Sequence, residues 1–100
     1  MKNFRTYNLA VEFYRLAAPL KLPRHLREQL SRASSSIVLN LAEARGKESI
    51  KDQKKFFYIA LGSLRESQAI LTLSNLEDSK AYSVLDSLGG HLYKLIQSIG

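Results

Sequence analysis

The chain contains no cysteine, which excludes disulfide bonds, cysteine-ligated zinc and thiol chemistry. Long apolar runs are absent as well, because Arg, Lys or Ser interrupts each apolar stretch every few residues, so no segment reaches the length of a transmembrane helix. The chain begins Met-Lys-Asn-Phe-Arg and lacks the apolar segment of a secretory signal peptide. We therefore expect a cytoplasmic protein of bacterial type, with no membrane partner.

Strand signals, internal repeats and low-complexity tracts are also missing. No segment alternates apolar and polar residues between turn residues. The 100 residues, of which 45% are apolar, are enough for one modest core and too few for two. The sequence therefore predicts an all-α protein with a single domain over residues 1–100.

Apolar residues recur at steps of three and four, the spacing that places them on one face of a helix. A predicted helix over 24–45 shows this most clearly, with a stripe formed by Leu26, Leu30, Ala33, Ile37, Leu41 and Ala44. The same periodicity predicts helices near 3–18, 49–74 and 79–98. Because the connections are only a few residues long, consecutive helices should lie antiparallel, as an up-down four-helix bundle.

The predicted helix ends carry matching signals. Pro23 suits the first turn of the second helix, where its missing N–H would have no partner anyway. Gly46 follows the end of that helix, where a left-handed cap is favourable. The run Ser49–Asp52 resembles a capping box before the third helix, and Asp78 or Ser79 is the expected N-cap of the fourth.

Two features of the later helices need a structural reason. Gly89 and Gly90 interrupt the fourth helix, and an interior glycine costs about 1 kcal/mol relative to alanine. A kink, a close approach of another helix or an outright break would explain them. The third helix has two adjoining apolar stripes, formed by Phe57, Leu61, Leu64 and Leu71 and by Phe56, Ala60 and Ile70. One stripe suffices in a small bundle, so the second predicts a homo-oligomer.

No motif in the sequence predicts catalysis, a cofactor or a metal site. His25 has Glu28 nearby, but a metal site needs more converging ligands, and the repeated Glu-x-x-His pattern of di-iron bundles is absent. His91 has no acidic neighbour, and we expect a structural or surface role for both histidines. The run Ser34–Ser36 lacks a nucleophile elbow, and no glycine-rich phosphate loop occurs. We therefore do not expect an enzyme.

Asn40 and Glu43 flank the apolar stripe of the second helix, beside Leu41 and Ala44. At such positions we expect partial burial, and buried polar groups need hydrogen-bond partners. The favoured interpretation is a hydrogen-bonded structural pair, Asn40 with Glu43, that fixes the helix register. The alternative is that the two side chains form part of a binding site.

The formal net charge of +6 is unevenly distributed. In an up-down bundle one end collects the start of the first helix, the connection between the second and third, and the end of the fourth. This basic end carries Lys2, Arg5, Arg45, Lys47, Lys51, Lys54, Lys55 and Lys94, against only Glu48 and Asp52. The other seven basic and seven acidic residues cancel. With Phe56 and Tyr58 nearby, it is a candidate site for RNA or DNA, and the alternative is an ordinary solvated face.

Two motifs stand out in the second and third predicted helices. They read Gln29-Leu30-x-Arg32-Ala33-x-x-Ser36-Ile37-x-x-Asn40-Leu41-Ala42-Glu43 and Phe56-Phe57-x-x-Ala60-Leu61-Gly62-Ser63-Leu64-x-Glu66. Together with Phe4 and Tyr14, they resemble the small four-helix-bundle proteins encoded within intervening sequences of bacterial 23S rRNA genes. The resemblance covers roughly the first three helices, and the fourth matches only as an amphipathic pattern. Ala10 and Ala44 depart from that family, which usually has Trp and Gly there.

The resemblance implies an up-down bundle that assembles as a ring-like homo-oligomer, often a pentamer. It also implies kinship with accessory subunits of diversity-generating retroelements, which bind a reverse transcriptase and nucleic acid. The leading hypothesis is a non-enzymatic, oligomeric nucleic-acid-associated protein, either an RNA-binding or a reverse-transcriptase accessory factor. The alternative is a protein–protein scaffold in which the second apolar stripe and the basic end serve assembly only.

Overall fold

The computed structural model describes residues 4–99, which form four α-helices. These are α1 (Phe4–Ala17), α2 (Arg24–Arg45), α3 (Ile50–Leu73) and α4 (Lys80–Ser98). The described residues contain no strand, so the all-α prediction is confirmed. Each observed boundary lies within one residue of the predicted one, and the predicted start at Asn3 lies outside the described residues. None of the four helices is both long enough and apolar enough to cross a bilayer.

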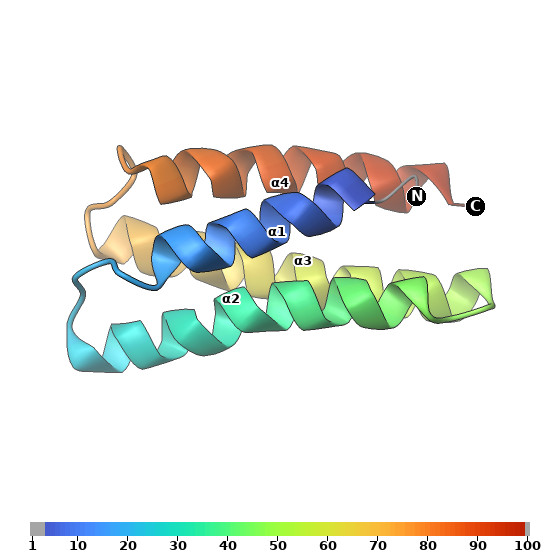
Figure 1. Cartoon of the computed structure of the whole chain (residues 1–100), viewed down its shortest axis with the longest axis horizontal. Coiled ribbons are helices and arrows are strands. Elements are labelled where there is room, and N and C mark those ends of the chain that lie inside the picture. The colour runs from blue at the N-terminus through green and yellow to red at the C-terminus, as the bar shows by residue number, and fades with distance from the viewer. Residues whose placement is uncertain (1–3, 100) are drawn as a thin grey trace.

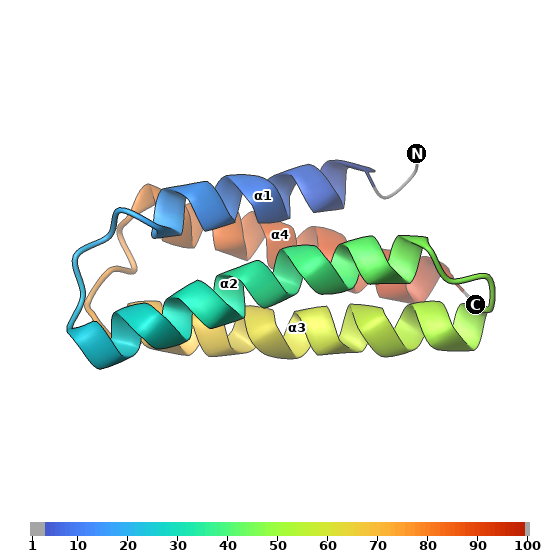
Figure 2. The same cartoon turned by 60° about the horizontal axis from the view of Figure 1, so that its bottom comes forward.

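The helices lie side by side along one long axis, in a body of 40 × 21 × 18 Å. Figures 1 and 2 show the chain reversing direction at each of its connections, so that successive helices run in opposite directions. Each helix packs on two neighbours, and α2 packs most extensively on α3. The α1–α4 contact closes the bundle between elements far apart in the sequence.

Apolar side chains from all four helices form the core. In α2 the predicted stripe is buried from Leu30 to Ala44, and Leu26 is half-buried at its edge. Phe13 of α1 and Leu92 of α4 are fully buried in the same core cluster.

The second apolar stripe of α3 packs within the same chain. Ala60 and Ile70 are buried, and Phe56 is half-buried against the core. Both stripes of α3 therefore pack within the same chain, and the expectation that the second stripe needs a partner is wrong. The large apolar side chains that α3 does expose are Ile50, Tyr58, Ile59 and Leu73, which belong to neither stripe. Oligomerisation itself stays a prediction.

Serine caps begin two of the helices as expected. The Ser49 hydroxyl accepts a hydrogen bond from the Asp52 N–H at 3.1 Å, and the Ser79 hydroxyl accepts one from the Tyr82 N–H at 3.1 Å. Pro23 is the N-cap of α2 and so lies one residue before the expected first-turn position. Its φ of −54° leads into the helix without strain.

The C-terminal ends differ from expectation. Gly46 has φ −84° and ψ −5°, so the expected left-handed cap is wrong. Instead α2 ends in tight turns, with the Gly46 and Lys47 N–H groups bonded to carbonyls three residues back. The left-handed cap occurs at Asn75, where φ is 57° and the Leu76 N–H bonds the Leu71 carbonyl at 2.9 Å. This is a Schellman motif with asparagine in the position that usually holds glycine.

The paired glycines of α4 have different surroundings. A Cβ added at Gly89 would lie 3.6 Å from Leu64 Cδ2, an ordinary van der Waals contact with α3, whereas a Cβ at Gly90 would meet nothing within 4 Å. The helix is continuous through both residues. The outright break does not occur, and a Cβ would fit at both positions, so a close approach of α3 does not require glycine at Gly89, and Gly90 has no packing reason among the described residues.

The N-cap of α4 gives the first testable prediction. Replacing Ser79 by Ala leaves the Tyr82 N–H without its acceptor and should lower the free energy of unfolding by about 1 kcal/mol. Urea denaturation followed by circular dichroism measures the change. The matched control is Ser83→Ala at an exposed interior position of α4, which should be neutral or slightly stabilising. Equal effects of the two substitutions would contradict the capping role.

Candidate nucleic-acid interface

The basic end lies where the start of α1, the α2–α3 connection and the last turns of α4 come together, on the right in Figure 1. Seven of its eight predicted cations lie in the described residues: Arg5, Arg45, Lys47, Lys51, Lys54, Lys55 and Lys94. The structure thus brings residues from all four helices to one end. Lys2 lies outside the described residues.

The aromatic ring of Phe56 contacts two of these cations. The Lys47 Nζ lies 5.2 Å from the centre of its ring, and the Lys55 Nζ lies 5.7 Å away. Both distances are within the range of cation–π attraction. Lys47 also forms an ion pair with Glu43, with Nζ 3.3 Å from Oε2, and is half-buried. Lys47 is therefore anchored in the protein, while Lys55 remains exposed to a ligand.

Two further contacts connect α1 to α2 and α4 at this end. The guanidinium of Arg45 lies over the ring of Tyr7, 5.6 Å from its centre. The Arg5 Nε donates a hydrogen bond to the His91 Nε2 at 3.2 Å. The His91 Nδ1 lies 2.9 Å from the Ser87 carbonyl and donates to it, since Nε2 acts as the acceptor. His91 and Tyr7 thus position basic residues. The sequence alone does not show this role, because it depends on how α1 packs against α4 and α2.

The remaining lysines of the basic end face solvent. Lys51 and Lys94 are exposed, as is Lys55, and Lys54 is half-exposed. None of them forms an ion pair with another described residue. Lysines at steps of three and four lie on neighbouring strips of a helix, so α3 presents three closely spaced positive charges. Such a cluster can meet the phosphates of a nucleic-acid backbone.

The expected hydrogen-bonded pair of Asn40 and Glu43 is wrong. Asn40 is half-buried and its amide donates to the Ser36 carbonyl at 2.9 Å and to the Ser36 hydroxyl at 3.0 Å. Glu43 is exposed and pairs with Lys47. The amide turns back along α2 toward the preceding turn, and the carboxylate turns toward solvent.

A polar network connects α2 to α3 at this point. The Ser63 hydroxyl donates to the Ser36 hydroxyl at 2.8 Å, and the Ser67 hydroxyl donates to the Ser63 carbonyl at 2.9 Å. A groove of about 460 Å³ opens above it, lined by Arg32, Ala33, Ser35, Ser36, Leu39, Asn40, Ser63 and Glu66. Six of these eight residues belong to the two sequence motifs. Residues of the two motifs therefore come together at one place in the fold, the outer seam between α2 and α3.

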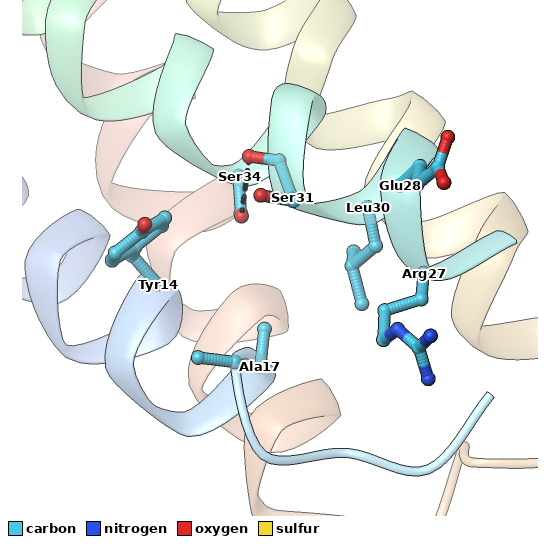
Figure 3. A pocket seen from close by; sticks show the side chains of 8 residues that line it. Tyr14, Ala17, Arg27, Glu28, Leu30, Ser31 and Ser34 are labelled. Carbon is cyan, nitrogen blue, oxygen red and sulfur yellow. Dashed lines mark hydrogen bonds between the residues drawn. The ribbon is translucent and has the colours of Figure 1, made fainter. Parts of the chain in front are cut away.

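A second cavity, of about 330 Å³, lies between α1 and α2 near their connection and far from the basic end. Figure 3 shows Tyr14 and Ala17 of α1 facing Leu30 and Ser34 of α2 across it. The Ser34 hydroxyl is satisfied by the Ser31 carbonyl at 3.3 Å. No group of three or more His, Asp or Glu side chains among residues 4–99 is placed to hold a metal ion.

Fold and site together define a small four-helix-bundle protein with a basic end and a polar α2–α3 seam. The family model for the 23S rRNA-intervening sequence protein matches residues 4–99, nearly the whole chain. The chain belongs to this family, and the resemblance carried by the two motifs is confirmed. Comparisons with curated protein sequences and with solved structures found no match.

The polar seam gives the second prediction. Replacing Ser36 and Ser63 by Ala, singly and together, should show a coupling free energy of about 0.5–1.5 kcal/mol, because the two hydroxyls bond each other across the helices. Unfolding in urea of the four proteins measures it. A matched cycle with Ser35, whose hydroxyl bonds only its own helix, should show no coupling to Ser63. Additive effects for Ser36 and Ser63 would contradict the bond.

Proposed function

We propose that this protein is a non-enzymatic nucleic-acid-associated protein that binds RNA or DNA through its basic end. The observation that carries the proposal is the cluster of solvent-facing lysines at the start of α3, with Lys51, Lys54 and Lys55 lacking acidic partners among the described residues. Its mechanism is electrostatic: each lysine that meets a phosphate releases a condensed counterion.

The position of these lysines supports a role in binding. The first turns of a helix carry the positive end of its dipole, so cations there are unfavourable to the fold. Lys51, Lys54 and Lys55 nevertheless crowd the beginning of α3, where Asp52 is the only acidic residue of the first turn. A positive helix end bearing lysines is a favourable place for phosphate groups.

Assembly into a homo-oligomer would multiply the basic end and raise affinity through several simultaneous contacts. We propose that two copies meet at a groove of about 290 Å³ between α1 and α2, lined by Val11, Tyr14, Arg15, Ser35, Val38 and Leu39. Leu39 lines this groove and is 65% exposed, so together with Val11 and Val38 it forms an apolar surface that a second copy would cover. A pentamer, and a reverse transcriptase as protein partner, are the forms of assembly that the resemblance implies.

A protein–protein scaffold is the alternative function, and the same groove favours it. In that case the basic end would be a solvated face, and the protein would act only through its apolar contacts. Charge reversal at the basic end and disruption of the groove separate the two functions.

The third prediction concerns the basic end. Replacing Lys51, Lys54 and Lys55 together by Glu should weaken binding of single-stranded and duplex oligonucleotides of every sequence. The slope of log affinity against log salt should become shallower by about 2–3, because three phosphate contacts are lost. Fluorescence anisotropy at several salt concentrations measures both quantities. Lys47 is kept, because its ion pair and aromatic contact belong to the fold.

A control variant makes the same change in charge at the opposite end of the bundle. Lys21, Arg27 and Lys80 are exposed there, and their replacement by Glu should leave the salt slope nearly unchanged. Equal losses in the two variants would mean that net charge alone governs binding. An unchanged affinity in the folded basic-end variant would favour the scaffold.

The fourth prediction concerns assembly. Light scattering should find an oligomer at micromolar concentration, and Leu39→Glu should shift the mass toward that of the monomer, because it places a carboxylate in the apolar groove. The matched control is Leu73→Glu, a substitution at a residue that is 71% exposed outside the groove, which should leave the mass unchanged. A monomeric wild-type protein would end this proposal.

A further inference from the structure

Two glycines on the outer faces of α3 and α4 lack a packing reason. A Cβ added at Gly62 or at Gly90 would meet nothing within 4 Å. Glycine inside a helix lowers its stability relative to alanine, and here no neighbouring side chain of the described residues requires the small size. A surface that must stay bare for a ligand would explain both positions.

Each bare glycine has an exposed tyrosine one helical turn away. Tyr58 precedes Gly62 by four residues on α3, and Tyr93 follows Gly90 by three on α4, so each pair shares one strip of its helix. The two tyrosines are 57% and 56% exposed. The Gln97 amide donates a hydrogen bond to the Tyr93 hydroxyl at 3.1 Å, which restrains that ring from its polar tip and leaves its faces available.

The two tyrosine–glycine pairs lie at the same level of the bundle. Gly89 lies against Leu64, and α3 and α4 run in opposite directions (Figure 1). With a rise of about 1.5 Å per residue, Tyr58 lies about 9 Å and Tyr93 about 6 Å from that contact, both toward the basic end. The same reasoning places Gly62 and Gly90 at nearly the same level along the bundle.

The lysines continue this surface. Lys51 and Lys54 precede Tyr58 by seven and four residues and so lie on its strip of α3, between the tyrosines and the α2–α3 connection. Paired aromatic rings beside a row of cations are what a nucleic-acid strand with unpaired bases requires, since bases stack on the rings while phosphates meet the lysines. A duplex keeps its bases stacked inside and cannot use the rings in this way.

We propose that the ligand of this protein is a single-stranded nucleic acid, whose unpaired bases stack on Tyr58 and Tyr93 over the bare surface at Gly62 and Gly90. This inference rests on the proposed function and adds the form of the nucleic acid and the residues that select it. The chemistry recognised is a flat base on a phosphate backbone, which RNA and DNA share.

The experiment measures binding of labelled twelve-nucleotide single-stranded RNA, single-stranded DNA and the corresponding DNA duplex to the full chain by anisotropy. Tyr58→Ala and Tyr93→Ala should each weaken single-strand binding about tenfold, while Tyr58→Phe and Tyr93→Phe should stay within about twofold of wild type. Duplex affinity and the salt slope should be unchanged in all four variants, because no phosphate contact is removed. Tighter binding of RNA would identify a ribose strand, and equal binding would identify any single strand.

Gly62→Gln and Gly90→Gln provide a second test. They are expected to make the protein more stable while weakening its binding, a combination that a purely structural role of the glycines would not produce. Each should raise the melting temperature, since it removes an interior glycine and its side chain extends into open space. Each should also weaken single-strand binding severalfold by covering the neighbouring ring. Higher stability with unchanged binding would overturn the role of the bare surface.

Other outcomes separate this inference from the proposed function. Wild-type binding that depends on salt but is unaffected by all the tyrosine and glycine variants would overturn the inference and leave the basic end as the binding site. Loss of duplex and single-strand binding alike in the Ala variants would also overturn it. A change of mass in light scattering for these variants would show that the surface lies between copies of the chain. No binding by the wild-type protein would end both proposals.

Discussion

The close packing of α2 on α3 is the constraint on which the rest of the structure depends. The Ser36 and Ser63 hydroxyl oxygens lie 2.8 Å apart although each side chain has only one carbon, so the two helix backbones must pass near each other. Small side chains such as Ala33 and Ala60 permit this approach. At the connection between α2 and α3, the same packing brings the Phe56 ring within 5.2 Å of the Lys47 Nζ.

At the basic end, positive charges lie close together, and their repulsion lowers the local stability of the fold. Like charges gather where α2 meets α3, and the fold offsets part of their repulsion with aromatic rings, since Tyr7 lies under Arg45 and Phe56 lies between Lys47 and Lys55. Lys47 also forms an ion pair with Glu43 there. Natural sequences violate local rules mainly at functional sites, and this end and the bare glycines of the outer face are two places where residues 4–99 do so.

The sequence predicted the helices and much of the core well, because periodicity and capping are local signals. Ser49 and Ser79 are the N-caps of α3 and α4, as those signals predict. The errors all concern three-dimensional surroundings. Gly46 is not the left-handed cap, which occurs instead at Asn75. Asn40 bonds Ser36 instead of Glu43, and the second stripe of α3 packs within the same chain. The spacing of residues along one helix predicts which face of the helix a side chain lies on. Which residue that side chain contacts depends on how a neighbouring helix packs against that face.

The closure of the bundle has a consequence for its folding. Three of the four helix–helix contacts join consecutive helices, and only the α1–α4 contact joins distant parts of the chain. Proteins dominated by contacts between sequence neighbours fold within about microseconds to milliseconds, since little chain entropy is lost before each contact forms. The α1–α4 contact brings together the most distant elements, so its closure carries the largest entropic cost. At the basic end this closure includes Arg5 and His91, so that end of the bundle takes its final shape only when the last helix docks on the first.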